Sequence, residues 1–229
     1  MVSLKSVFRR LGRAIRFGTY DHRKVFEHIY TTRYWGDRES VSGIGSSLAQ
    51  TEHIRQELPK IIDQFQIEIV FDAPCGDLHW MREVLKSVDI SYIGGDIVPA
   101  VVELAEKNYS GTKASFRVFD IVSDEFPKAD LWICRDVLFH LSNEKIIKTL
   151  HNFVKSDVKY ILVTTHTAST IVNRNIVTGD FRQLDMFKAP FNFPASAVLY
   201  RFDDFALPHP PREMVLIRRE DLASALPPA

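Results

Sequence analysis

The sequence predicts an α/β fold, a doubly wound and mostly parallel sheet of about seven strands, with the last pair antiparallel and helices on both faces. From about residue 67, short β-branched runs alternate with longer segments of helical periodicity, and this order is typical of right-handed βαβ units. The chain has 229 residues, of which 45% are hydrophobic, so it is large enough for one α/β domain with an appendage.

The individual elements follow this alternation along the chain. The expected parallel strands cover residues 67–72, 91–96, 115–120, 129–136 and 158–166. Helical patterns cover residues 78–88, 99–109 and 143–155, and proline at position 99 suits a first helical turn. Two further strand candidates, 196–202 and 213–219, lie on either side of the sequence PHPP and could close the sheet as an antiparallel pair.

The domain organisation has two parts. We expect residues 1–60 to form an N-terminal helical or lid segment packed on the core, and residues 61–229 to form the sheet domain. Residues 167–195 interrupt the sheet domain with polar and aromatic residues, two prolines and no sustained period. A segment of this length without regular structure is usually functional or disordered, and its aromatic residues argue against disorder. This insertion is therefore expected to contribute to a substrate site.

The charge distribution gives no global attraction to nucleic acid, because Lys plus Arg and Asp plus Glu each total 29. Residues 1–24 differ, with seven basic residues, one acidic residue and apolar residues at roughly helical spacing. This pattern is consistent with peripheral contact with an anionic membrane surface or with a solvated helix. The sequence has no secretory signal pattern and no run of 18 apolar residues. A cytoplasmic protein, in peripheral contact with a membrane or not, is the expectation.

Cysteine and histidine usage predicts no metal or disulfide framework. There are two cysteines and eight scattered histidines without paired ligand spacing, so neither a disulfide scaffold nor a structural zinc site is expected. The acids near the fourth strand leave Mg²⁺ open, although no full ligand set is legible in the sequence.

Acidic residues close four successive expected strands: Asp72, Asp96, Asp120 and the pair Arg135-Asp136. In open parallel sheets, ligands bind outside the carboxyl ends of the strands. A nicotinamide dinucleotide would need the pattern GxGxxG at the turn after the first strand. Residues 71–78 at this turn read FDAPCGDL, which contains one glycine and two carboxylates. The pattern favours a cationic ligand with sugar hydroxyls and an amine over NAD.

Residues 67–166 resemble the class I S-adenosylmethionine (SAM)-dependent methyltransferases. The stretch FDAPCGDL resembles the first motif of that family, with Pro74 and Leu78 where glycines are more usual, and an acid ends the second strand. Residues 34–51 and 175–194 resemble a bacterial subset associated with glycan and secondary-metabolite pathways. The resemblance implies a Rossmann-like fold, methyltransferase activity and SAM as the cofactor.

The resemblance also implies roles for the strand ends. The residues expected to contact the cofactor there are Asp72, Ala73 and Gly76 at the methionine part, Asp96 and Ile97 at the ribose, Asp120 and Ile121 at the adenine, and Arg135 beneath the sulfonium. A carboxylate such as Asp96 suits a ribose because it can accept hydrogen bonds from both hydroxyls.

The segment before the sheet predicts a lid. Trp35 would exclude water, and Ser46, Ser47 or Thr51 would meet the methionine carboxylate of the cofactor. The alternative is a linker in which Ser47 caps the following helix.

The catalytic and substrate residues are less sharply defined by the sequence. Asp136, His140 and His166 are candidates for removing a proton from an acceptor hydroxyl, although His140 is equally explained as a structural histidine. The candidate acceptor-pocket residues in the insertion are Asp180, Arg182, Phe191 and Asn192. The expected function is methyl transfer to a hydroxyl of a sugar, glycan precursor or other polar small molecule. Methylation of an amine or carboxylate, and a non-catalytic scaffold, are the alternatives, and the oligomeric state stays open.

Overall fold

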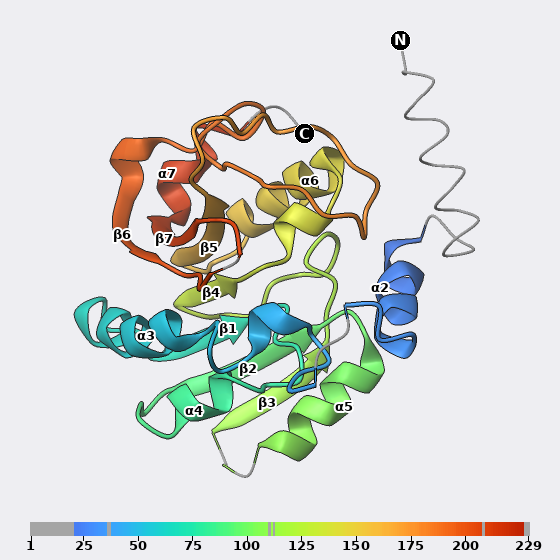
Figure 1. Cartoon of the computed structure of the whole chain (residues 1–229). Helices are drawn as coiled ribbons and strands as arrows, with labels where there is room; N and C mark the ends of the chain where they lie inside the picture. The colour runs from blue at the N-terminus through green and yellow to red at the C-terminus, as the bar shows by residue number, and fades with distance from the viewer. Residues whose placement is uncertain (1–20, 36–37, 110, 112, 208, 227–229) are drawn as a thin grey trace.

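The computed structural model describes residues 21–35, 38–109, 111, 113–207 and 209–226 (Figure 1). Most of the expected basic N-terminal helix falls in residues 1–20, outside this part. Among the described helices, none combines the length and the apolar character needed to cross a bilayer.

One seven-stranded sheet organises the molecule, in the order β3-β2-β1-β4-β5-β7-β6. Strands β1 to β5 run parallel, and β7 is antiparallel to both β5 and β6. This confirms the expected fold class. The strands are β1 (Ile69–Asp72), β2 (Ser91–Asp96), β3 (Ala114–Val118), β4 (Leu131–Cys134), β5 (Tyr160–His166), β6 (Val198–Asp203) and β7 (Arg212–Arg218).

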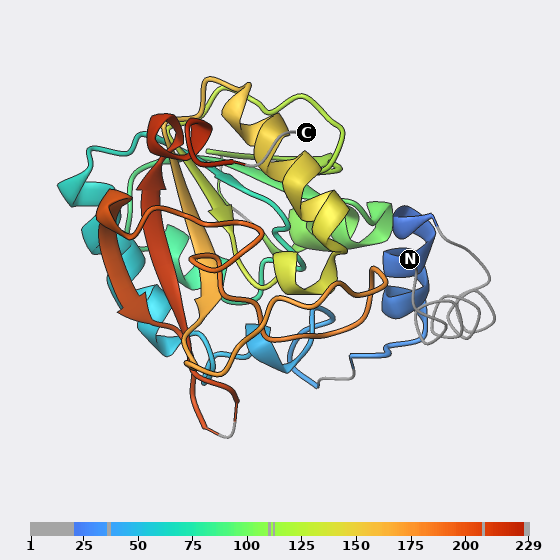
Figure 2. The same ribbon diagram turned by 90° about the horizontal axis from the view of Figure 1, so that it is seen from above.

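Helices cover both faces of the sheet, as Figures 1 and 2 show. Alternate residues of the central strands face opposite layers, as strand geometry requires. Phe71 and Trp132 pack in the same cluster as the buried residues of α6 and α7. Val70 and Leu131 pack with α3, α4 and α5. The helices are α2 (His22–Thr31), α3 (Glu52–Gln64), α4 (Met81–Leu85), α5 (Pro99–Asn108), α6 (Asn143–Val154) and α7 (Arg219–Ala223).

Strand β4 ends earlier and helix α4 begins later than the sequence predicts, and backbone conformation explains both. Strand β4 ends at Cys134, and Asp136 shortly after it has a left-handed φ of 53°. Helix α4 begins at Met81 rather than at residue 78, because Leu78 has a φ of 60°, which is incompatible with a right-handed helix. Both positions lie at the carboxyl edge of the sheet.

The insertion 167–195 contains no helix or strand, yet it is tied to the core. The backbone N–H of His166 donates to the carbonyl of Leu184 at 2.8 Å, and the N–H of Met186 donates to Thr165 Oγ1 at 3.0 Å. Leu184, Met186 and Phe191 are fully buried in the cluster with α6. The insertion therefore lies against the carboxyl end of β5.

Candidate functional site

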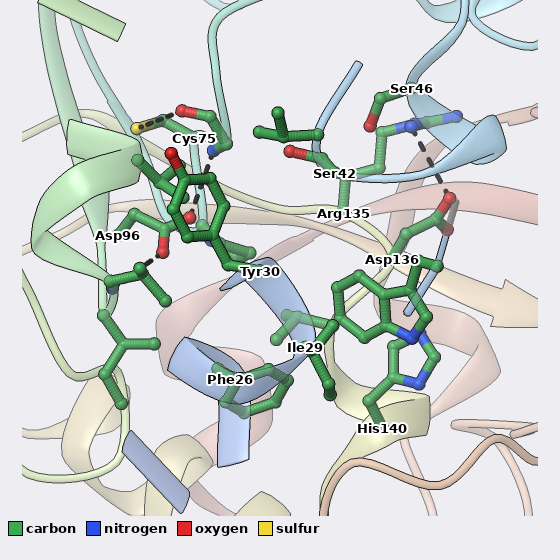
Figure 3. Close-up of a pocket in the computed structure, with 18 of the residues that line it drawn as sticks. Phe26, Ile29, Tyr30, Ser42, Ser46, Cys75, Asp96, Arg135, Asp136 and His140 are labelled. Atoms are coloured by element: carbon green, nitrogen blue, oxygen red, sulfur yellow. Dashed lines mark hydrogen bonds and ion pairs between the residues drawn. The ribbon is translucent and has the colours of Figure 1, made fainter. Parts of the chain in front are cut away.

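A cavity of about 120 Å³, here called the first cavity, lies at the carboxyl ends of β1, β2 and β4 (Figure 3). Open α/β sheets bind their ligands at this edge. Phe26, Ile29 and Tyr30 of α2 form an apolar wall, and Ser42 and Ser46 lie on the other side. The strand ends contribute Gly76, Asp96, Ile97, Arg135, Asp136 and His140.

The turn after β1 requires glycine at position 76. Gly76 has a φ of 55°, and a Cβ atom at this position would lie 2.2 Å from Ser42 Oγ. Leu78 is also left-handed, with a φ of 60°, although it stands where the methyltransferase motif more usually has glycine. The backbone requirement at position 78 is thus preserved while the side chain fills the core, at a cost on the order of 1 kcal/mol.

Residues 40–46, here called the loop 40–46, are fastened to this turn by Asp77. Its carboxylate accepts hydrogen bonds from Ser40 Oγ at 2.8 Å and from the N–H of Val41 at 3.1 Å. Asp77 is buried, so these bonds are shielded from water. The second carboxylate of the motif therefore has a structural role that the sequence did not reveal.

Asp96 presents a buried carboxylate to the first cavity. Burial raises its pKa to about 6, although the N–H groups of Val98 and Gly76 donate to it at 3.0 and 3.3 Å and oppose that shift. Asp72 lies deeper, outside the cavity lining, where it accepts from Tyr92 Oη at 2.8 Å. Ala73 is buried beside it, and its carbonyl accepts from Trp132 Nε1.

Asp120 and Ile121 line a smaller adjoining cavity of about 30 Å³, together with His22 and Phe26 of α2. Lys145 Nζ donates to Nδ1 of His22 at 3.2 Å, so the hydrogen on Nε2 is the one donated to Asp120 Oδ2 at 2.8 Å. Burial acts to raise the pKa of Asp120, but the hydrogen bond from His22 and other donors lower it overall. A hydrogen bond therefore joins helix α2 to Asp120, the acidic residue just after β3.

A larger cavity of about 320 Å³, the second cavity, adjoins the first. Both are lined by Trp35, Ser42, Ser46, Asp136 and His140, which form the wall between them. The second cavity is also lined by residues from the segment after β4, from β5, from the insertion, and from the β6–β7 loop and the start of β7, namely Phe139, His166, Phe181, His209, Pro210 and Arg212.

Four charged side chains form a buried network behind this wall. Arg135 donates from Nε to Asp204 at 2.7 Å and from Nη1 to the carbonyl of Gly45 at 2.9 Å. Arg212 donates to Asp136 Oδ2 at 3.0 Å. Burial acts to raise the pKa of Asp136, but the neighbouring Arg135 and Arg212 outweigh it and lower the pKa. Asp136 is thus held as a carboxylate and is a weak proton acceptor.

Two of the three histidines that line the second cavity, His140 and His166, have opposite hydrogen-bond arrangements. Nδ1 of His140 lies 2.9 Å from the carbonyl of Asp180, which can only accept, so this nitrogen carries the hydrogen and Nε2 is the basic atom. Nδ1 of His166 accepts from the N–H of Leu184 at 3.2 Å, so the hydrogen of the neutral ring is on Nε2. Burial, mainly, lowers the pKa of His166 to about 4.

Other residues singled out from the sequence lie apart from both cavities. Ser47 and Thr51 are buried just before α3, where Thr51 Oγ1 donates to the carbonyl of Ser47 at 2.8 Å. Thr51 is the N-cap residue of this helix, and its side chain makes no capping hydrogen bond. Arg182 donates to the carbonyl of Leu141 at 2.6 Å, and burial lowers its pKa to about 10. Phe191 is in the core and Asn192 is exposed. Asp180 contributes its carbonyl to His140 rather than a pocket wall.

Several residues of the site were not expected from the sequence. The apolar wall of α2 looks like the face of any amphipathic helix, and Arg212 and His166 become neighbours only through the antiparallel pairing of β5 with β7. Trp80 lines the first cavity, and the guanidinium of Arg135 lies 5.6 Å from its ring centroid. Among the described residues, no group of three His, Cys, Asp or Glu side chains is placed to hold a metal ion.

The residues of the first cavity fit SAM. The left-handed backbone at Gly76 favours glycine where a ligand would approach closely, and buried Asp96 can accept from sugar hydroxyls. Asp120 in the smaller adjoining cavity has a carboxylate that could accept from an exocyclic amine. The apolar wall of α2 suits a ligand that is largely enclosed.

Comparison with known proteins agrees with this fit. Residues 70–157 match the family model described as a methyltransferase domain, while a search of curated protein sequences finds no match. The structure resembles magnesium protoporphyrin IX methyltransferase from Synechocystis PCC 6803 with bound SAM, with 14% identity, 86% of this chain and 97% of that chain covered, and a TM-score of 0.61.

Two further solved structures are similar. A SAM-dependent methyltransferase from Leishmania major has 14% identity, coverage of 90% and 89%, and a TM-score of 0.61. Human N-acetylserotonin methyltransferase in complex with SAM has 17% identity, coverage of 93% of this chain and 66% of that chain, and a TM-score of 0.52. The matched residues 70–157 include the left-handed turn and the acids at the strand ends, so this part of the chain is similar to a methyltransferase domain, and the fold as a whole is that of the class I SAM-dependent methyltransferases.

Proposed function

We propose that this enzyme transfers the methyl group of SAM to a hydroxyl of a sugar, a glycan precursor or another polar small molecule, with His140 as the general base. The supporting observation is the position and tautomer of His140. Its side chain lies in the wall between the two cavities, and its Nδ1–H donates to Asp180, which leaves Nε2 as the proton acceptor.

The acceptor is argued from the cavity rather than from similar structures. Their names include a porphyrin methyltransferase, an N-acetylserotonin methyltransferase and an N-methyltransferase, and these acceptors differ in chemistry. The second cavity contains three histidines, one arginine and aromatic rings. Such a lining suits a polar ring that stacks and hydrogen-bonds.

When bound, SAM supplies an electrophilic methyl group on a sulfonium. The second cavity would hold the acceptor so that its oxygen is in line with that methyl group. Nε2 of His140 would accept the hydroxyl proton, and the resulting imidazolium would lie against the ring of Trp35, whose centroid is 4.7 Å away. A cation over such a ring is stabilised by roughly 0.5–2 kcal/mol. Trp35 would also exclude water from the wall.

Asp136 is better suited to positioning than to proton transfer. Its carboxylate is bonded to Arg212 and to Thr164 Oγ1, and its lowered pKa makes it a poor base. We infer that it fixes the wall beneath His140. The same geometry makes His166 a donor at Nε2 rather than a base.

The test replaces His140 by asparagine, whose amide can still donate to the Asp180 carbonyl but has no equivalent of Nε2. We expect kcat for hydroxyl acceptors to fall by about 10²- to 10⁴-fold, with calorimetric affinity for S-adenosylhomocysteine (SAH) within about threefold. His53→Asn is a matched control, because Nδ1 of His53 also lies 2.9 Å from a backbone carbonyl, that of Asp203, at an exposed position.

Labelled methyl transfer would be measured with a panel of sugars, phenols, amines and carboxylates. An unchanged kcat in His140→Asn would exclude this residue as the base. Transfer to amines or carboxylates alone would overturn the hydroxyl assignment.

If the acceptor is a glycan precursor, we further propose that the protein is cytoplasmic and contacts the membrane surface through residues 1–24. The excess of seven basic residues over one acid supports it.

A further inference from the structure

The second cavity presents a hydrogen-bond donor that proton abstraction does not use. Nδ1 of His166 is occupied by the N–H of Leu184. The ring stays neutral at ordinary pH, since burial holds its pKa at about 4. Among the described residues, Nε2 has no hydrogen-bond partner, and the side chain lines the second cavity. A ligand or a water molecule in the second cavity can therefore accept from this N–H.

The two imidazoles of this cavity lie close enough to act on one small molecule. The ring of Phe139 is 4.6 Å from that of His140 and 5.3 Å from that of His166, so the imidazoles are within about 10 Å of each other. Phe181 lies 6.1 Å from both. One small molecule with two neighbouring oxygens could therefore reach both imidazoles through hydrogen bonds of about 2.8 Å each.

The charges around the cavity favour a neutral partner for this donor. Asp136 is paired with Arg212 at 3.0 Å and lies 3.5 Å from Arg135. Arg135 is paired in turn with Asp204 at 2.7 Å. Two cations and two anions therefore balance one another, and no uncompensated guanidinium remains in this network to attract a phosphate or carboxylate. A hydroxyl oxygen can accept from a neutral imidazole N–H without any change in this balance.

We propose that His166 is a specificity-determining residue that donates from Nε2 to a second oxygen of the acceptor, so that the preferred acceptor is a neutral 1,2-diol on a six-membered ring. This inference rests on the proposed function. One hydroxyl of the diol gives its proton to His140, and the adjacent hydroxyl is held by His166. Phe139 and Phe181, which line the same cavity, give the acceptor ring apolar contacts. Both an aromatic ring and a sugar ring can carry two such adjacent hydroxyls.

Two substitutions separate the donor from the rest of the ring. Asparagine at position 166 can accept from the Leu184 N–H but places no donor at Nε2. Glutamine at the same position places an amide N–H near the original Nε2. The acceptors are catechol, its 1,3-isomer resorcinol and phenol for aromatic rings. For sugars they are methyl mannoside and its 3-O-methyl ether, which has no two adjacent free hydroxyls. Thermal unfolding and SAH calorimetry verify that each variant folds and binds the cofactor product.

We expect wild-type enzyme to prefer the 1,2-diols of one ring type, through a lower KM. In His166→Asn the ratio of kcat/KM between the 1,2-diol and its single-hydroxyl analogue falls by about three- to tenfold, and His166→Gln restores much of it. Which ring type is methylated distinguishes an aromatic from a sugar acceptor.

Three results would overturn the inference. Equal kcat/KM values for diols and for acceptors with a single hydroxyl would show that His166 makes no contact with a second oxygen, while methylation of hydroxyls would still stand. Loss of kcat with every acceptor in His166→Asn, with folding and SAH affinity retained, would make His166 a base. The inference is also wrong if no diol is methylated and none binds to the SAH complex by calorimetry; transfer to amines or carboxylates alone would remove the proposed function with it.

Discussion

Asp96 is the residue whose titration is expected to set the affinity for the cofactor. Burial raises its pKa to about 6. The proposed contact would have ribose hydroxyls donating to its ionised form, so binding would lower that pKa and release a proton. Affinity for SAH should therefore rise as pH increases from 5 to about 6, by at most about tenfold per pH unit, and level off above 7. Calorimetry between pH 5 and 8 measures this.

Two variants make the assignment specific. Asp96→Asn should bind SAH more weakly and without this pH dependence. Asp72 also has a raised pKa, about 7, caused mainly by burial, but it does not line the first cavity. Asp72→Asn should retain the dependence. A wild-type affinity that stays constant between pH 5 and 7 would contradict the role given to Asp96.

At the scale of one element, helix α2 is the outer wall of the first cavity. Its His22 is bonded to Asp120 at 2.8 Å, and Phe26, Ile29 and Tyr30 face the cavity. SAM in the first cavity would be enclosed on several sides. We therefore expect that α2 or the loop 40–46 has to move before the cofactor can enter or leave. The bond between His22 and Asp120 opposes movement of α2.

Replacing His22 by alanine should accelerate SAH dissociation by about three- to tenfold, as expected for the loss of one hydrogen bond to a carboxylate. Stopped-flow fluorescence measures the rate, and hydrogen exchange in residues 22–31 should become faster. Lys24→Ala, an exposed position on the same helix, is the control. Dissociation at the wild-type rate in His22→Ala would show that α2 does not control exchange.

The elements also show what the sequence could predict. The acids at the strand ends were predictable because parallel strands bring their carboxyl ends to one edge. The insertion 167–195 has no period that assigns its residues to a face, so Arg182 and Phe191 looked like pocket residues although they tie and fill the core. Phe181, between them in sequence, is the residue that lines the second cavity. The tautomers of His140 and His166 depend on carbonyl and N–H groups of this insertion.

At the scale of the whole molecule, the buried charge network joins parts of the chain that are distant in sequence. It connects the loop 40–46, the end of β4, the segment after β6 and the start of β7. Asp204 is fully buried and paired with Arg135. Asp204→Leu should lower the free energy of unfolding by about 3–5 kcal/mol, because it leaves Arg135 buried without its main partner.

The double variant Arg135→Met with Asp204→Leu removes one charge of each sign and keeps Asp136 paired with Arg212. We expect it to recover at least half of the loss caused by Asp204→Leu alone, which urea denaturation would measure. Losses that simply add would show that the two side chains stabilise the fold independently.

The fold itself was predictable from the sequence, since local patterns specified each layer. The alternation of strands and helices indicated the parallel sheet, and the two runs around PHPP indicated the antiparallel end. The second cavity was not predictable in the same way. Its residues come from β5, β7, the loop 40–46, the segment after β4, the insertion and the β6–β7 loop, and only the packed molecule brings these segments together.

The loop 40–46 has a consequence for the geometry of the reaction. One end is held by Asp77 after β1 and the other by Arg135 after β4, and β1 and β4 are paired neighbours in the sheet. The spacing of these two strands therefore sets the position of the wall between the cavities. The stiffness of the loop itself has little effect on that position. Small, conformationally free residues can build a rigid spacer between two reactants when the sheet sets where both of its ends are fixed.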